Sequence, residues 1–317
     1  MVLLASAIPR VLLMRLEDSI IAVTGASGFL GRNIVEVLLA RGARVIAVIR
    51  DPDRSPHLHE CRVELRRADL ACPGDLVRGL DGADALVSNA ALLNFGWQDW
   101  QQHLETNVKG AINVLEAAAV VGIKRVVHLS SISVYAEPKR RRLDEDQPLY
   151  DLEKPRSFSQ VYPLSKALGE REIWRLAARL GLQLTTLRPS GIFGAWDDKF
   201  WRLVKWLFSP PVMIVPAGLR IGWVYAGDVA EAVALSLERP LSAGRAYNLC
   251  DGDRSFWQLL NAWQKAGGRA PIVKIPLPVP VKRDYDNGRA KRELGWKPTP
   301  LVAAMRQLRE LESRWPR

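Results

Sequence analysis

Residues 20–31 of the chain read IIAVTGASGFLG, an apolar run followed by a turn that contains three glycines. The apolar part has the length and β-branched composition of a strand buried on both faces. Residues 30–41 continue with helical periodicity and stop at Gly42, which is suited to a left-handed C-cap. Residues 44–49 form a second apolar run. This spacing predicts a βαβ unit with a right-handed crossover and a parallel sheet.

Short apolar runs and helical segments keep alternating to about residue 190. The pattern predicts a Rossmann-type, doubly wound α/β fold over residues 19–190, with the parallel sheet completed by residues 223–249. Beyond it, residues 191–222 and 250–317 are expected to form a smaller, discontinuous C-terminal substrate-binding region. The further strands are expected at 63–66, 85–89, 125–130, 183–188 and 245–249, and the further helices at 103–121, 163–180 and 224–238.

The 317 residues carry a formal net charge of +11, which comes largely from arginines scattered along the chain. One local basic run, residues 139–142, is neither interleaved with aromatic residues nor part of a nucleic-acid reading module, so no nucleic-acid partner is expected. Cys61, Cys72 and Cys250 have no disulfide or metal-ligand spacing. We therefore expect no metal site and a cytoplasmic protein.

Residues 1–18 are expected to form an N-terminal extension, which Pro9 makes unlike a signal peptide. Met14 leads directly into the first strand, so residues 1–13 can also lie outside the native protein. No apolar stretch is long enough to span a membrane. The apolar segment 200–215 leaves three interpretations open: a helix that lines an apolar pocket, a peripheral contact with a membrane surface, or core and dimer packing.

The glycine turn has the context of a dinucleotide-binding fingerprint, because Gly25, Gly28 and Gly31 follow a strand and open a helix. Their missing side chains permit a tight turn and let a pyrophosphate approach the N–H groups at the helix N-terminus. At the end of the second strand, Arg50 is placed to bind a 2′-phosphate, which favours NADP. A shift of one residue would put Asp51 there instead, so NAD stays an alternative.

Farther along, Tyr162 and Lys166 occur in the sequence YPLSK. On a helix, residues i and i+4 share one face, so the ammonium can lie beside the phenol. A nearby cation favours the phenolate and lowers the pKa of a tyrosine, which could then act as an acid or a base. A phosphate-binding turn and a proton donor in one chain indicate redox chemistry.

With these residues in place, the chain resembles the extended branch of the short-chain dehydrogenase/reductase superfamily from residue 19 to residue 300. This branch includes nucleotide-sugar epimerases and dehydratases, 3β-hydroxysteroid dehydrogenases and dihydroflavonol-type reductases. The resemblance implies a catalytic set of Ser131, Tyr162 and Lys166, with Ser130 as the competing serine. It implies a cofactor site made of Gly25, Ser27, Gly28, Phe29, Leu30, Gly31, Arg50, Asp69, Leu70, Asn89, Ala90, Ala91, Asn107, Tyr162, Lys166, Pro189 and Ile192.

The resemblance implies hydride transfer between a nicotinamide cofactor and a carbonyl or alcohol carbon. Nucleotide-sugar members carry an asparagine soon after an arginine-proline pair, whereas this chain has Ser190 there, although Arg220 could bind a diphosphate. The Trp- and Phe-rich segment 196–208 favours a hydrophobic substrate of the steroid, lipid, polyketide or flavonoid type. The alternatives are a nucleotide-sugar epimerase or dehydratase with bound NAD, and a non-catalytic NAD(P)-sensing protein. The two long helices at 103–121 and 163–180 resemble those that form a four-helix dimer interface in this superfamily, and this resemblance implies a homodimer.

Overall fold

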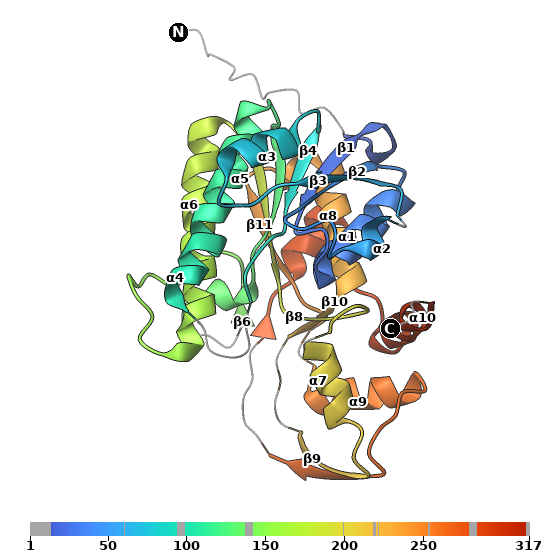
Figure 1. The fold of residues 1–317 in the computed structure, drawn as a ribbon. Coiled ribbons are helices and arrows are strands. Elements are labelled where there is room, and N and C mark those ends of the chain that lie inside the picture. Colours follow the sequence, from blue (N-terminus) through green and yellow to red (C-terminus); the bar gives the residue numbers. More distant parts are fainter. Residues whose placement is uncertain are drawn as a thin grey trace, which may run out of the picture.

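Seven parallel strands form the central sheet, in the order β11-β7-β5-β4-β1-β2-β3 (Figure 1). The computed structural model describes residues 14–314 except 60, 94–98, 137–141, 199, 218–219, 221, 253 and 279–283, so residues 1–13 of the N-terminal extension and most of the basic run lie outside it. The strands are β1 (Ile20–Thr24), β2 (Arg44–Ile49), β3 (Val63–Arg67), β4 (Ala85–Ser88), β5 (Arg125–Leu129), β7 (Gln183–Pro189) and β11 (Arg245–Leu249). The predicted doubly wound parallel sheet is confirmed.

Helices cover both faces of this sheet. One face is covered by α1 (Phe29–Ala40) and α8 (Ala226–Glu238), and the other by α3 (Pro73–Leu80), α5 (Gly110–Val120) and α6 (Val161–Leu180). The helix expected at 103–121 begins earlier, as α4 (Trp100–His103), and continues through a π-helical segment, Leu104–Lys109, into α5. Since both faces are covered, the strands are apolar on both sides.

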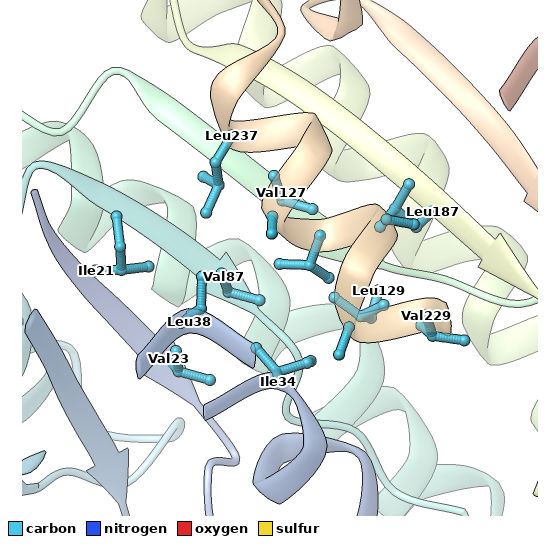
Figure 2. Packing of buried hydrophobic residues seen from close by; sticks show 14 of the residues in the cluster. Ile21, Val23, Ile34, Leu38, Val87, Val127, Leu129, Leu187, Val229 and Leu237 are labelled. Carbon is cyan, nitrogen blue, oxygen red and sulfur yellow. The ribbon is translucent and has the colours of Figure 1, made fainter. Parts of the chain in front are cut away.

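Beneath α1 and α8, apolar side chains of the two helices pack against the strands of the sheet. Ile34 and Leu38 of α1 point toward the strands, and Val229 of α8 approaches from the neighbouring helix (Figure 2). Between them lie Val87 of β4 and Val127 of β5, both fully buried. Each such side chain contributes about 1.5–3 kcal/mol by leaving water. The carboxyl ends of the strands are therefore held rigidly, and the site is built there.

A second cluster of buried apolar residues forms the small lobe, at the bottom of the view in Figure 1. Its elements are α7 (Phe200–Leu207), β9 (Val212–Pro216), α9 (Phe256–Lys265), β12 (Val273–Leu277) and α10 (Leu301–Arg314). Two short parallel pairs accompany the main sheet: β8 (Gly191–Phe193) with β10 (Trp223–Tyr225), and β6 (Arg142–Leu143) with β13 (Asp284–Tyr285). The lobe comes from two separate stretches of chain, and its boundaries as a substrate-binding region stay a prediction.

Among the described residues, no helix is long and apolar enough to cross a membrane. Nor do these residues contain a cluster of three or more His, Cys, Asp or Glu side chains that could hold a metal ion.

Candidate active site

A cleft of about 2550 Å³ runs past the carboxyl ends of the strands and into the small lobe. Pockets for small ligands usually measure about 300–1,000 Å³, so this one has room for a dinucleotide and a substrate together. Most of the predicted site residues line it: Gly25, Ser27, Gly28, Phe29, Leu30, Arg50, Asp69, Leu70, Asn89, Ala90, Ala91, Ser131, Tyr162, Lys166, Pro189 and Ile192. Gly31 and Asn107 are not among the described lining residues and lie buried beside them.

The glycine turn is packed so closely that side chains cannot enter it. Gly25 has a positive φ of 65°, and a Cβ there would lie 2.8 Å from Cα of Ala90. A Cβ on Gly31 would lie 2.1 Å from the carbonyl oxygen of Gly25. The side-chain amide of Asn89 donates to that same oxygen at 3.2 Å and ties the end of β4 to the turn. Gly25 and Gly31 are therefore required by packing, as a fingerprint of this kind demands.

The N-terminus of α1 is open toward the cleft. Gly28 is its N-cap and supplies no side-chain hydrogen bond to the N–H groups of the first turn. Such N–H groups, together with the helix dipole, bind phosphate oxygens well. Because Gly28 is exposed and lines the cleft, the turn fits the pyrophosphate of a dinucleotide.

Asn107 supports the site from the π-helical segment. Its side-chain oxygen accepts a hydrogen bond from the backbone N–H of Leu92 at 2.7 Å. Its side-chain N–H groups donate to the Leu92 carbonyl at 3.1 Å and to the Ser165 hydroxyl at 3.0 Å. These bonds fix the chain after β4 against α6. The predicted contact of Asn107 with the cofactor stays a prediction, and the geometry favours a role in positioning.

Ser131, Tyr162 and Lys166 come together on the floor of the cleft. Ser131 makes a side-chain hydrogen bond with Tyr162, and it accepts a second one from the hydroxyl of Ser133 at 2.9 Å. Lys166 is buried, and its ammonium donates to the carbonyl oxygen of Leu129 at 2.7 Å. The serine, tyrosine and lysine predicted from separate parts of the sequence therefore share one site.

The expected lowering of the Tyr162 pKa by Lys166 is wrong for this structure. Burial raises the pKa of Tyr162 to about 12, and the hydrogen bond with Ser131 opposes that rise only in part. Burial also lowers the pKa of Lys166 to about 8, against the attraction of the Glu170 carboxylate. Loss of hydration disfavours the charged form of both groups. Near pH 7, Tyr162 is therefore a neutral phenol that can give up a proton.

Ser130 turns away from Tyr162 into a buried network. Its hydroxyl donates to the carboxylate of Glu170, which is fully buried. The same carboxylate accepts two hydrogen bonds from the Arg188 guanidinium, and Arg188 also donates to the hydroxyl of Tyr135 at 2.9 Å. The competition between the two serines is therefore resolved by geometry in favour of Ser131 as the partner of Tyr162.

The far end of the cleft is rich in arginine. Arg50 directly follows β2, is exposed and lines the cleft, as does Arg54. Arg32 also lines it, and its guanidinium contacts Nδ1 of His57 at 2.6 Å. Burial, with the charge of Arg32, lowers the pKa of His57 to about 4, so the ring is neutral near pH 7. The pairing of Arg32 with His57 was not predicted, because it depends on residues 51–59 folding back over α1.

The lining also contains aromatic and apolar side chains: Ile132, Ile192, Trp196, Trp206, Trp223 and Tyr285. Trp196 shares a small side pocket with Arg32 and His57. Trp196 has a positive φ of 69°, which is unusual for a residue with a large side chain. Arg220, which could have bound a diphosphate, is not among the described residues that line the cleft. The cleft lining therefore combines cationic side chains with aromatic and apolar ones.

The family model for the NAD dependent epimerase/dehydratase family matches residues 21–250. The chain belongs to this family. It is 31% identical to cinnamoyl-CoA reductase 1 of Arabidopsis thaliana, over 86% of this chain and 80% of that protein. It is 32% identical to a 4-hydroxy-2-methyl-3-oxo-4-farnesyl-3,4-dihydroquinoline-1-oxide ketoreductase of Stigmatella aurantiaca, over 80% of this chain and 75% of that protein. The protein is thus an NAD(P)-dependent enzyme of the extended short-chain dehydrogenase/reductase type.

A solved structure confirms the fold of this family member. The UDP-glucuronic acid 4-epimerase of Bacillus cereus in complex with NAD superposes with a TM-score of 0.74, over 93% of this chain and 99% of that chain. The two sequences are 20% identical, so this likeness concerns the fold.

Proposed function

We propose that the protein transfers a hydride between NADPH and the carbonyl or alcohol carbon of a hydrophobic substrate, with Tyr162 as the acid or base. The observation that carries this proposal is the Ser131–Tyr162 hydrogen bond in a cleft whose lining includes several aromatic and apolar side chains. The bound nicotinamide supplies the hydride or accepts it. The protein supplies binding, orientation and the proton.

In the reductive direction, the roles of the three residues follow from their placement. Tyr162 gives its phenolic proton to the carbonyl oxygen of the substrate as negative charge develops there. Ser131 donates a hydrogen bond to the same oxygen and orients the phenol. Lys166, held at the carbonyl of Leu129, places a positive charge beneath the site and is within the lining that would hold the nicotinamide ribose. Tyr162 is protonated near pH 7, as a proton donor must be, although the raised pKa makes it a weaker acid than a free phenol.

The proposed preference for NADP rests on charge at the end of β2. Arg50 lines the cleft, whereas Asp51 is not among the described lining residues and pairs with Arg54 at 3.8 Å. A guanidinium at this place suits a 2′-phosphate, and a carboxylate would repel it. Arg32 adds a further positive group at the same end of the cleft.

A hydrophobic substrate is supported by the aromatic lining and by the names of two relatives. A cinnamoyl group and a farnesyl group are both apolar, and both relatives are named as reductases. We therefore propose an aromatic or isoprenoid carbonyl compound ahead of a UDP-sugar.

NADPH oxidation in the presence of hydrophobic ketones and aldehydes, with the product identified by mass spectrometry, tests this function. Stoichiometric formation of the alcohol is expected, and the rate with NADPH should exceed the rate with NADH. Retained NAD without net consumption, together with conversion of a UDP-sugar, would show an epimerase instead. Cofactor binding without turnover of any carbonyl compound would show a sensing protein.

We also propose that α5 and α6 form the interface of a homodimer. Val120 at the end of α5 is 72% exposed, although it is a large apolar residue. Sedimentation velocity tests this directly, since a monomer at micromolar concentration would contradict it.

A further inference from the structure

The small lobe ends in a two-stranded sheet with an uncovered apolar face, at the bottom of Figure 1. Val212 and Ile214 of β9 are 52% and 62% exposed, and their register partners Val273 and Ile275 of β12 are both 48% exposed. Alternation along the strand turns Val215 inward, where it is fully buried. A sheet face in contact with water usually carries polar side chains. This face therefore indicates a contact surface.

Other exposed apolar side chains gather on the same lobe. Of the twelve large hydrophobic residues exposed in the described part of the chain, eight belong to it. Leu203 and Trp206 of α7 are 51% and 68% exposed and lie on one face of the helix, three residues apart. Ile272, just before β12, is 86% exposed. The main sheet and its helices, although larger, expose only four residues of this kind among those described.

Two segments that contribute to the same lobe are rich in basic residues. Residues 199–222 and 254–283 contain ten basic residues and no acidic residue, whereas the whole chain has a net charge of +11. Lys205 and Arg254 pair with Glu312 and Asp251, which come from outside these two segments. The remaining basic residues still give the lobe a positive field, which attracts anionic surfaces.

We propose that the outer face of β9–β12 docks onto an anionic lipid bilayer. Ile214 and Ile275 would enter the boundary between headgroups and acyl chains, and Trp206 would lie at the same level, where indole rings are favoured. Exposed basic residues such as Arg202 and Arg269 would contact lipid phosphates. A second copy of this chain fits less well, because a symmetric contact would place the two basic lobes against each other.

Docking in this way would bring one end of the cleft to the bilayer. Arg202, Trp206 and Ser209 of the small lobe line the cleft. An apolar substrate dissolved in the bilayer could then enter without crossing water. This consequence rests on the proposed function, whereas the docking itself does not, so the test below measures binding alone.

The test is co-sedimentation of the full chain with vesicles of phosphatidylcholine that contain about one third phosphatidylglycerol. Binding is expected at low salt, and it should weaken as salt is added and with phosphatidylcholine alone. The double variant Ile214→Ser/Ile275→Ser should lower the partition coefficient at least about tenfold, because two apolar side chains no longer leave water. Arg269→Gln should lower it about fivefold.

Leu241→Ser is the matched control, since Leu241 is 74% exposed and lies between α8 and β11, outside the small lobe. Its partition coefficient should equal that of the unchanged chain. No sedimentation with anionic vesicles at low salt would overturn the proposal, as would equal binding by the double variant. A dimer that the double variant dissociates would assign this face to a second copy and would also overturn it. Unchanged vesicle binding by Tyr162→Phe is expected, which separates docking from catalysis.

Discussion

The central sheet and the β9–β12 pair are made of the same kinds of residue, and they differ in what covers them. Val127 in β5 is fully buried between helices, whereas Ile214 in β9 is 62% exposed. Both sheets are parallel and pair in regular register. An apolar strand therefore belongs to the core only where helices pack over both of its faces. In this protein the central sheet, covered on both faces, positions the candidate active-site residues. The β9–β12 pair, covered on one face, exposes an apolar surface.

The largest expected difference between the two regions is in the free energy of unfolding that is lost when an ion pair is broken. Glu170 and Arg188 under the central sheet have side chains 0% and 6% exposed, whereas Glu312 and Lys205 in the small lobe are 28% and 26% exposed. Glu170→Gln should cost about 3–5 kcal/mol, because it leaves a buried guanidinium without its charge partner. Glu312→Gln should cost about 0–1 kcal/mol. Urea unfolding measures both, and equal losses would contradict the contrast.

A second contrast compares apolar side chains directly. Leu86 of β4 is fully buried beneath α3 and α5, so Leu86→Ala should lower the free energy of unfolding by about 2–5 kcal/mol. Ile214→Ala removes a mostly exposed side chain and should change it by less than about 0.5 kcal/mol. A loss of several kcal/mol for Ile214→Ala would mean that the outer face is packed in solution.

Arginines of the two regions should bind different ligands, the cofactor in the larger region and anionic vesicles in the small lobe. Arg50→Ala should weaken NADPH binding about tenfold to a hundredfold, because a charge-assisted bond to the 2′-phosphate is lost, and it should leave NADH binding nearly unchanged. Arg202→Ala should weaken vesicle binding and leave the ratio of NADPH to NADH affinity alone. Fluorescence titration with both cofactors measures this. A ratio that Arg50→Ala does not alter would contradict the NADP assignment.

A further expected effect is a pH dependence in the larger region, since all four histidines of the chain precede residue 129. The pKa of His57 is lowered to about 4 from an ordinary 6.5 by burial and by Arg32. The unfolded chain therefore takes up this proton first, and stability falls as pH drops from 6.5 to about 4. Unfolding curves for the unchanged chain and His57→Gln should diverge in that window and run parallel above it. Parallel curves throughout would contradict the assignment.

Much of the central sheet can be predicted from the sequence, because its strands are continuous apolar runs bounded by turn residues. β1, β2 and β11 begin and end at the predicted residues, and the other strands differ by a single residue at one end. The glycine turn could also be predicted, since three glycines spaced in this way between a strand and a helix are typical of a dinucleotide-binding turn. The small lobe could not be predicted in this way. Its strands contain prolines, and whether a helix covers them depends on packing between distant segments.

In the candidate site, too, some features could be predicted from the sequence and others could not. Ser131, Tyr162 and Lys166 could be identified by spacing and resemblance. The network of Ser130, Glu170 and Arg188 could not, because its members lie on three separate elements and meet only through the fold. The protonation of Tyr162 depends on its burial, which the sequence does not state. A neighbouring lysine therefore predicted a lowered pKa where burial raises it.

The most direct measurement is the single-turnover rate of carbonyl reduction by Tyr162→Phe, with NADPH bound in advance. Tyr150→Phe serves as the control, because Tyr150 does not line the cleft. A fall of about a hundredfold or more is predicted for Tyr162→Phe, with NADPH affinity and thermal stability preserved, and no such fall for the control. Retention of more than about a tenth of the rate by Tyr162→Phe would contradict the assignment of Tyr162 as the proton donor.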